Sequence, residues 1–197
     1  MSRLTNLARP HYSKKGTDNN DDIKGTDRMD SIHAGKGDDK VDGGKGHDLI
    51  NGGDGNDSLM GGEGNDVIYG GKGNDLINGG DGNDRLIGGE GDDMIYSGSG
   101  RDWIHAGKGD DVINLGTGSK FVKTGDGEDI ISINGTVAAG SKDMPKGTVF
   151  VNDFDVKEDV LSIGRIANPE KNIMVTQYGR DTVISFRDNP DYKVVLQ

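Results

Sequence analysis

The sequence contains no cysteine, few aromatic residues and no long apolar segment. Aromatic residues make up 5% of its 197 residues, and the absence of Cys excludes disulfide bonds and thiolate metal sites. No apolar run reaches the length of a membrane-spanning helix, and the opening MSRLTNLARPHYSKKG lacks the apolar core of a signal peptide. We therefore expect no transmembrane segment and, if the protein is exported, a signal elsewhere in the chain.

Positive charge is also scarce. The chain has 23 Lys and Arg residues against 34 Asp and Glu, a formal net charge of -11. Nucleic acids and anionic lipids need a basic surface, so we expect neither as the main partner. With only 30% hydrophobic residues, the composition lies close to that of disordered chains unless the acidic groups are neutralised. The composition therefore indicates a cationic partner, and metal ions fit best.

Known catalytic motifs are missing as well. The sequence has no GxSxG, no HExxH, no phosphate loop of the Walker type and no EF-hand loop. Catalysis needs a nucleophile with a base, or a metal with an open position. No two of the four histidines are adjacent in the sequence: His11, His33, His47 and His105. The sequence therefore predicts a protein that is not an enzyme.

Glycine, in contrast, is abundant and periodic. The chain has 35 glycines, and residues 16–132 divide into thirteen consecutive nonapeptides with the consensus GGxG(N/D)Dx(I/L/V)x, as in GGEGNDVIY and GGKGNDLIN. A disordered glycine-rich linker would not keep an aliphatic residue at every ninth place. Position eight is a branched aliphatic residue in every unit: Ile23, Ile32, Val41, Ile50, Leu59, Ile68, Ile77, Leu86, Ile95, Ile104, Ile113, Val122 and Ile131.

The period predicts a coil of eighteen residues made of two short strands and two turns. Positions seven to nine fit a three-residue strand whose middle side chain faces inward. The other six positions form a turn, in which the glycines permit positive φ angles and close backbone approach. Stacked coils place each position-six Asp about 4.8 Å from the next. One Ca²⁺, which prefers oxygen ligands at roughly 2.3 to 2.6 Å, fits midway between two such carboxylates.

This pattern resembles the RTX (hemolysin-type) calcium-binding nonapeptide repeat. The resemblance implies an all-β fold: a right-handed parallel β-roll, a nonapeptide solenoid with calcium held between successive turns on the same side. The roll would occupy residues 16–132, after a lead-in of residues 1–15. Residues 133–197 resemble the C-terminal flank of the same family, which implies a cap of β-strands and a secretion signal.

The resemblance also implies the calcium ligands, position by position. The implied carboxylate ligands are Asp30, Asp39, Asp48, Asp57, Asp66, Asp75, Asp84, Asp93, Asp102, Asp111 and Asp129. The implied carbonyl ligands are glycines at positions two and four: Gly44, Gly46, Gly53, Gly55, Gly62, Gly64, Gly71, Gly73, Gly80, Gly82, Gly89 and Gly91. Pairing units two apart predicts roughly eight to ten bound Ca²⁺ ions.

Three units depart from the consensus. The first two, GTDNNDDIK and GTDRMDSIH, lack glycine at positions two and four. We expect Asp21 and Asp30 either to bind calcium weakly or only to complete the stack. The twelfth unit, LGTGSKFVK, has Lys120 at position six. A cation at that place predicts the loss of one calcium site.

Apolar residues at position seven leave three interpretations open. If position eight points inward, position seven points outward, and an exposed apolar stripe indicates packing against something. The stripe is either a set of singly tolerated residues, a docking surface for the C-terminal segment, or a surface for a partner or self-association. On one face it comprises Leu49, Val67, Trp103 and Phe121, interrupted by Arg85.

Beyond the repeats the sequence predicts a loop over residues 135–147 and then short strands separated by turn residues. The expected strands are 148–154, 159–163, 172–178, 181–186 and 192–196. Such a unit would cover the open end of the roll. Asp153, Asp155, Glu158 and Asp159 either hold one more calcium ion or form a solvated turn.

The sequence as a whole predicts a secreted, extracellular calcium-binding protein with a structural or cell-surface role. Its few buried aliphatic residues and its stacked acidic groups predict that the array is disordered without calcium and folds on binding it. The resemblance implies export by a type I secretion apparatus. The alternative functions are a polysaccharide-binding module, or an accessory or secretion module of a larger RTX exoenzyme.

Overall fold

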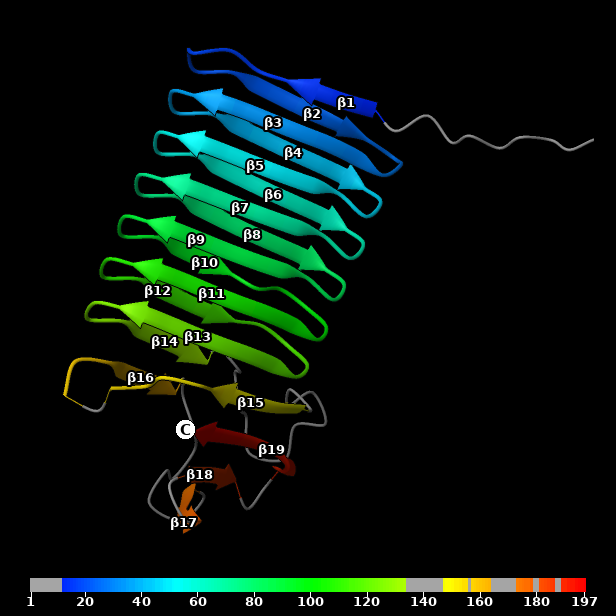
Figure 1. Ribbon diagram of the computed structural model, residues 1–197. Helices are drawn as coiled ribbons and strands as arrows, with labels where there is room; N and C mark the ends of the chain where they lie inside the picture. The colour runs from blue at the N-terminus through cyan, green and yellow to red at the C-terminus, as the bar shows by residue number, and fades with distance from the viewer. Residues whose placement is uncertain (1–11, 134–146, 156, 164–172, 179–180, 187–188) are drawn as a thin grey trace, which may run out of the picture.

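The protein is a flattened spiral of short β-strands (Figure 1). Within the part of the chain that the structure describes there is no helix, and so none that could cross a membrane. The computed structural model describes residues 12–133, 147–155, 157–163, 173–178, 181–186 and 189–197.

The strands of the repeat alternate between two sheets that form the two walls of the spiral. One wall contains β1 (Tyr12–Lys15), β3 (Asp30–Lys36), β5 (Leu49–Asp54), β7 (Val67–Lys72), β9 (Arg85–Glu90), β11 (Asp102–Lys108) and β13 (Lys120–Asp126). The other contains β2 (Asp22–Thr26), β4 (Lys40–Lys45), β6 (Ser58–Glu63), β8 (Leu76–Asp81), β10 (Met94–Tyr96), β12 (Val112–Leu115) and β14 (Ile130–Ile133).

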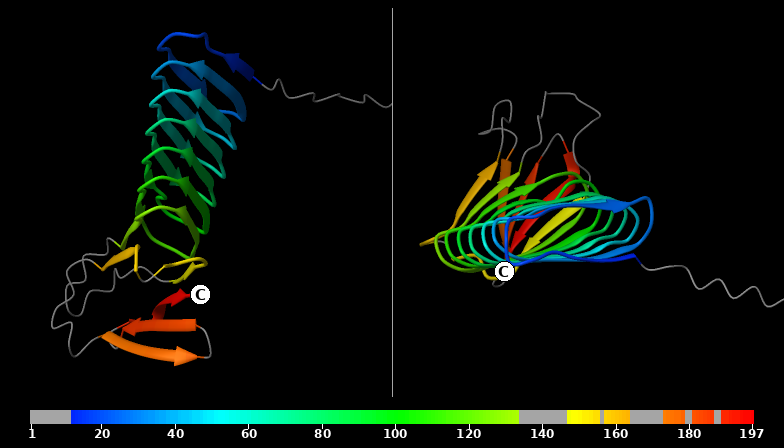
Figure 2. Two further views of the ribbon diagram at one scale, coloured as in Figure 1. Left: turned by 60° about the vertical axis from the view of Figure 1, so that its left-hand side comes forward. Right: turned by 90° about the horizontal axis from the view of Figure 1, so that it is seen from above.

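Neighbouring strands within each wall are parallel and related by eighteen residues. Ile50 of β5 lies opposite Ile68 of β7, and Ile77 of β8 lies opposite Ile95 of β10. Seen along the stack, successive coils lie over one another with a gradual rotation (Figure 2). The predicted parallel β-roll is confirmed.

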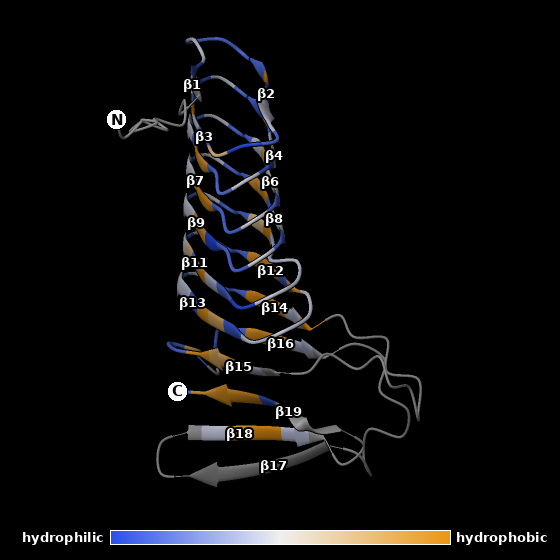
Figure 3. Cartoon of the chain, turned by 90° about the vertical axis from the view of Figure 1, so that its right-hand side faces the viewer, coloured by the Kyte–Doolittle hydropathy of each residue, from blue (hydrophilic) through white to orange (hydrophobic). Residues whose placement is uncertain are grey.

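The core is a narrow column of position-eight side chains between the walls. Ile50, Ile68 and Ile77 are each 0% exposed, and apolar colour recurs on the strands of each coil (Figure 3). Ile23, at the open N-terminal end, is only partly buried. Position one also points inward, where Ala34 and the other non-glycine residues at this position are at most 1% exposed. The periodicity therefore predicted the core correctly.

The strands are longer than the sequence predicted. Strand β5, for example, covers positions seven to nine of one unit and positions one to three of the next. Gly53 lies opposite Gly71, and Asp54 lies opposite Lys72, so the ladder continues through residues that were assigned to the turn. The prediction of three-residue strands was wrong. A glycine with positive φ, such as Gly53 at 121°, still pairs with the glycine that has the same conformation in the next coil.

The C-terminal segment extends both walls and then adds an antiparallel part. β15 pairs in parallel with β13, and β16 pairs in parallel with β14, which makes one further coil. β19 joins β15, and β18 and β17 complete the wall, so the cap of β-strands is confirmed. The five strands are β15 (Gly147–Val151), β16 (Val160–Ile163), β17 (Ile173–Tyr178), β18 (Asp181–Phe186) and β19 (Asn189–Leu196). Most of the predicted loop 135–147 and of the lead-in 1–15 falls outside the described residues.

The position-seven side chains point outward, as expected. Leu49 is 45% exposed and Trp103 is 38% exposed. Arg85 continues this column instead of interrupting it, because its guanidinium lies 4.4 Å from the centre of the Trp103 ring. At the C-terminal end Phe121 stacks on Phe150 of β15, with ring centres 5.1 Å apart. For Phe121, the interpretation of position seven as a docking surface for the C-terminal segment therefore holds.

Candidate metal centres in the turns

The position-six aspartates form a buried column at each edge of the roll. In each regular pair of coils, the carboxylate Oδ1 accepts a hydrogen bond from the backbone N–H of the aspartate eighteen residues earlier. The bond from Asp57 to Asp75 and the bond from Asp75 to Asp93 both measure 2.8 Å. The sequence reasoning placed one ion between two stacked carboxylates and did not assign their individual oxygens. In the structure one of the two oxygens of each carboxylate is used to hold the next coil.

The other oxygen, Oδ2, is buried and has no hydrogen-bond partner among the described residues. This holds for nine aspartates: Asp39, Asp48, Asp57, Asp66, Asp75, Asp84, Asp93, Asp111 and Asp129. Each of these residues is at most 2% exposed. A buried carboxylate oxygen without a partner is costly, so such an atom calls for a ligand. A bound cation fits it, and Ca²⁺ prefers oxygen ligands of this kind.

Burial also raises the pKa values of these carboxyl groups. Desolvation raises the pKa of Asp48 and Asp57 to about 6, although a hydrogen bond from the backbone opposes it. The same cause raises the pKa of Asp75 and Asp93 to about 7. A divalent cation would offset this desolvation by stabilising the ionised form.

Glycine leaves room for these oxygens. Gly44, at position two, has φ +98°, and an added Cβ would lie 2.5 Å from the carbonyl oxygen of Thr26 in the coil before. Gly43, at position one, would place its Cβ 2.7 Å from Asp48 Oδ2. The turn is therefore a cradle that a side chain would fill.

The carbonyl groups of positions two and four point along the stack. An added Cβ on Gly53 would contact the carbonyl oxygen of Gly35, and one on Gly55 would contact that of Gly37. The glycine ligands implied by the family share this arrangement: the carbonyl oxygen of each lies beside the position that a Cβ would take on the glycine eighteen residues later. They are Gly44, Gly46, Gly53, Gly55, Gly62, Gly64, Gly71, Gly73, Gly80, Gly82, Gly89 and Gly91.

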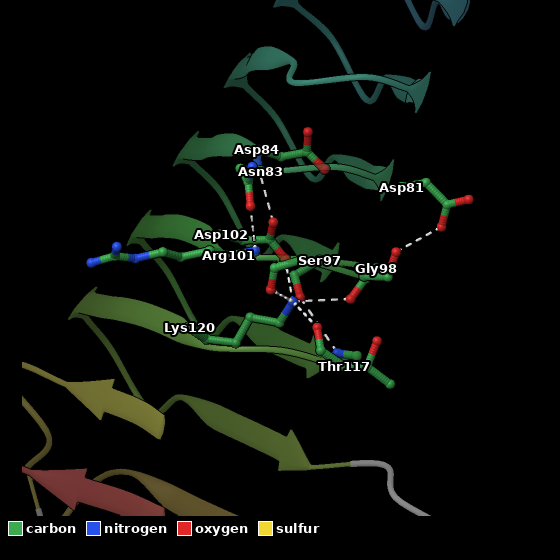
Figure 4. A network of polar contacts seen from close by, with 12 residues as sticks. Asp81, Asn83, Asp84, Ser97, Gly98, Arg101, Asp102, Thr117 and Lys120 are labelled. Carbon is green, nitrogen blue, oxygen red and sulfur yellow. Dashed lines mark hydrogen bonds and ion pairs between the residues drawn. The ribbon is translucent and has the colours of Figure 1, made fainter. Parts of the chain in front are cut away.

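The turn that contains Asp102 shows that these groups converge on one cation (Figure 4). The ammonium group of Lys120 donates to the carbonyl oxygens of Gly98 and Gly100, at positions two and four, over 3.0 Å each. It also contacts the Asp102 carboxylate at position six and the Thr117 carbonyl oxygen at 2.7 Å. A position-two carbonyl, a position-four carbonyl and a position-six carboxylate can thus hold one positive charge together.

Backbone oxygens would dominate such a site. Among the described residues no group of three or more His, Cys, Asp or Glu side chains is placed to hold a metal ion. Each regular turn supplies one free carboxylate oxygen, and the carbonyls would supply the other ligands. The ligand set is therefore spread over the backbone, where a search for clustered side chains does not detect it.

The first two turns differ from the rest. Asp21 Oδ2 accepts hydrogen bonds from the Thr17 N–H and hydroxyl at 2.7 and 2.9 Å. Asp30 Oδ2 accepts the same pair of bonds from Thr26. Because threonine satisfies both Oδ2 atoms, the structure favours the interpretation that these aspartates complete the stack, although Asp30 Oδ1 is buried without a partner among the described residues. The sequence reasoning missed the threonines, although their place at position two was the available signal.

The acidic residues of the C-terminal segment are arranged as a turn. Asp159 Oδ1 accepts the Asp129 N–H at 3.2 Å, so Asp159 continues the aspartate column beyond the last regular unit. Asp153 Oδ1 accepts the Thr124 N–H at 3.0 Å, and Asp155 Oδ1 accepts the Lys157 N–H. These hydrogen bonds favour the solvated turn over a separate calcium site.

Comparisons with known proteins agree with this geometry. The family model described as RTX calcium-binding nonapeptide repeat (4 copies) matches residues 15–50, 51–86 and 87–119, more than half of the chain. No curated protein sequence matches it.

Two solved structures resemble the chain at 18% identity. The extracellular lipase LipA from Serratia marcescens has a TM-score of 0.31, with 98% of this chain and 39% of the lipase covered. The AlgE6R3 subunit of the Azotobacter vinelandii mannuronan C5-epimerase has a TM-score of 0.25, with 92% and 72% covered. The chain thus spans well under half the length of the lipase.

Proposed function

The chain belongs to the RTX calcium-binding nonapeptide repeat family, and we propose that it is a secreted protein whose β-roll folds as it binds calcium outside the cell. RTX repeats bind Ca²⁺. The observation that carries the proposal is the set of buried Asp Oδ2 atoms without partners. In the folded roll they place uncompensated negative charge in the interior, and a divalent cation removes that cost.

The same oxygens set the number of ions that we propose. Nine aspartates have an unpaired Oδ2, so we propose about nine calcium ions per chain, one for each such turn. Extracellular calcium modules bind at about 0.1 to 1 mM. At cytosolic calcium levels the proposed sites would be empty and the array unfolded. Outside the cell the sites would fill and the coils would stack.

Circular dichroism and size-exclusion chromatography of the full chain test the coupling between folding and calcium. In EDTA we expect an unfolded spectrum and an expanded chain, and in about 10 mM Ca²⁺ a sheet spectrum and a compact one. Magnesium is the matched control, because Mg²⁺ demands an octahedral shell and keeps its waters. A sheet spectrum that persists in EDTA, or an equal response to Mg²⁺, would refute the proposal.

We propose a binding and structural role for the roll, without catalysis. Its position-six carboxylates are buried, repeat at every turn and are used for hydrogen bonds between coils, as the 2.8 Å bond from Asp57 to Asp75 shows. A reacting group needs access to its substrate. Export by a type I apparatus with a C-terminal signal is proposed from the family resemblance. Secretion of the chain with and without residues 133–197 tests it.

Polysaccharide binding is a second candidate, favoured by the outer surface of one wall. A groove of about 270 Å³ there is lined by Trp103, Phe121, Lys123 and Phe150, among others. Arg85 stacks on Trp103 at its edge. Aromatic rings beside cations suit sugar rings that carry carboxylates. A glycan array in calcium tests it: Trp103→Ala should abolish binding, whereas Met94→Ala on the other wall should not.

A further inference from the structure

Lys120 is a lysine with no exposed surface at the edge of the roll. It takes position six of its unit, where the regular units have aspartate, and its side chain is 0% exposed. Long lysine side chains at an edge ordinarily extend their ammonium group to water. This one turns inward, which means that the interior supplies enough oxygen ligands to replace its hydration.

Four oxygens surround the Lys120 ammonium. Two are the carbonyl oxygens of Gly98 and Gly100, each at 3.0 Å, and one is the carbonyl oxygen of Thr117 at 2.7 Å. The fourth is Oδ2 of Asp102, the atom that is left without a partner in the regular turns. Lysine has three N–H donors for these four oxygens and carries a full positive charge, so it takes the place of a bound cation among them.

The preceding coil on the same edge shows what the turn is like without Lys120. Asp84 also has glycine at positions two and four and its Oδ1 bonded to the coil before, from Asp66 at 2.9 Å. Its Oδ2 has no partner among the described residues, whereas that of Asp102 does. Two residues beside the carboxylate differ: the one eighteen places later, which is Asp102 for Asp84 and Lys120 for Asp102, and the one at position one, which is Gly79 for Asp84 and Ser97 for Asp102. Of these, only Lys120 supplies a positive charge.

We propose that the Lys120 ammonium is a resident cation that occupies the ion site of the Asp102 turn in place of calcium. The inference rests on the proposed calcium function and assigns one turn that does not take the ion. Beyond Lys120, the next residue on that edge is Val149, which offers no carboxylate. The metal column on this edge therefore ends with a charge that cannot dissociate, next to the C-terminal strands.

Calcium stoichiometry tests the assignment. Lys120→Asp restores the second carboxylate of the site, and Lys123→Asp makes the same change of charge at an exposed position in the same strand. By equilibrium dialysis we expect Lys120→Asp to bind about one more ion than the wild type, and Lys123→Asp to bind the same number. If Lys120→Asp gains no ion while the wild type binds calcium, the assignment is overturned.

Thermal unfolding gives a readout that does not depend on counting ions. Lys120→Met leaves Asp102 as a buried charge without its cationic partner, and we expect its Tm to fall by about 6 to 20 °C, against about 2 °C or less for Lys123→Met. Equal Tm values would overturn the assignment. A wild-type chain that binds no calcium would instead refute the proposed function, and the two lysine variants would still test the role of Lys120.

Discussion

The calcium midpoint of folding should respond differently to two adjacent residues of β8. Ile77 is 0% exposed and faces the core, whereas Leu76 is 42% exposed and faces solvent. Truncating a buried isoleucine to alanine costs about 2 to 5 kcal/mol, and a surface substitution costs about 0.5 kcal/mol or less. The two variants therefore report directly on which side of the strand forms the core.

The number of coupled ions sets how far each midpoint moves. If folding takes up nine ions, the folding constant scales with the ninth power of the calcium concentration. A loss of 2 to 5 kcal/mol is then recovered by a rise in calcium of only about 1.5-fold to 2.6-fold. For Leu76→Ala the same relation gives a shift of about 1.1-fold or less.

Calcium titrations followed by circular dichroism measure both midpoints. A tenfold shift for Ile77→Ala would mean that far fewer ions are coupled to folding than the structure indicates. Equal shifts for Ile77→Ala and Leu76→Ala would refute the assignment of position eight to the core. No shift for either would show that the sheet spectrum does not come from this roll.

Three further predictions concern the turns. Gly44→Ala should destabilise the roll by more than about 1 kcal/mol, because of its positive φ and the Thr26 carbonyl, and should raise the calcium midpoint where Ser58→Ala, on the surface, does not. Asp75→Asn keeps the acceptor for the Asp57 N–H but loses the charge, so equilibrium dialysis should show at least one weakened site, and unchanged binding would contradict the ligand role. Because burial raises the pKa of Asp75 to about 7, above its ordinary 3.8, the folded metal-free roll binds more protons than the unfolded chain between these values. Acidification from pH 8 to 5 should therefore increase the sheet signal that circular dichroism measures without calcium, and a signal that is constant over this range would contradict the raised pKa.

The periodic part of the fold could be predicted because each coil repeats the same local rules. A branched aliphatic residue at every ninth place identifies the core, and Ile50, Ile68 and Ile77 all lie in it. Glycine at positions one, two and four identifies the turns. Neither pattern shows that the glycines also pair in the ladder, because pairing depends on the matching conformation in the next coil. The strand length was therefore underestimated.

The atomic arrangement of the site was less accessible. The residue types predicted an aspartate column, but not that Oδ1 holds the preceding coil and leaves only Oδ2 free. The reach of Lys120 back to Asp102 depends on a rotamer, which a sequence does not show. The sequence did not predict that Asp159 belongs to the aspartate column, because it follows Asp129 by thirty residues instead of eighteen.

The eighteen-residue register has a consequence for how such a chain can change in length. Ile50 faces Ile68 in one wall, and each coil contacts mainly the coil before and the coil after it. Loss or duplication of one whole coil would leave every remaining neighbour with an equivalent neighbour and alter the height by about 4.8 Å. Loss of a single nonapeptide would instead exchange the two walls beyond that point, and bring residues from opposite faces into one column. Genetic variants that survive should therefore differ by even numbers of repeats.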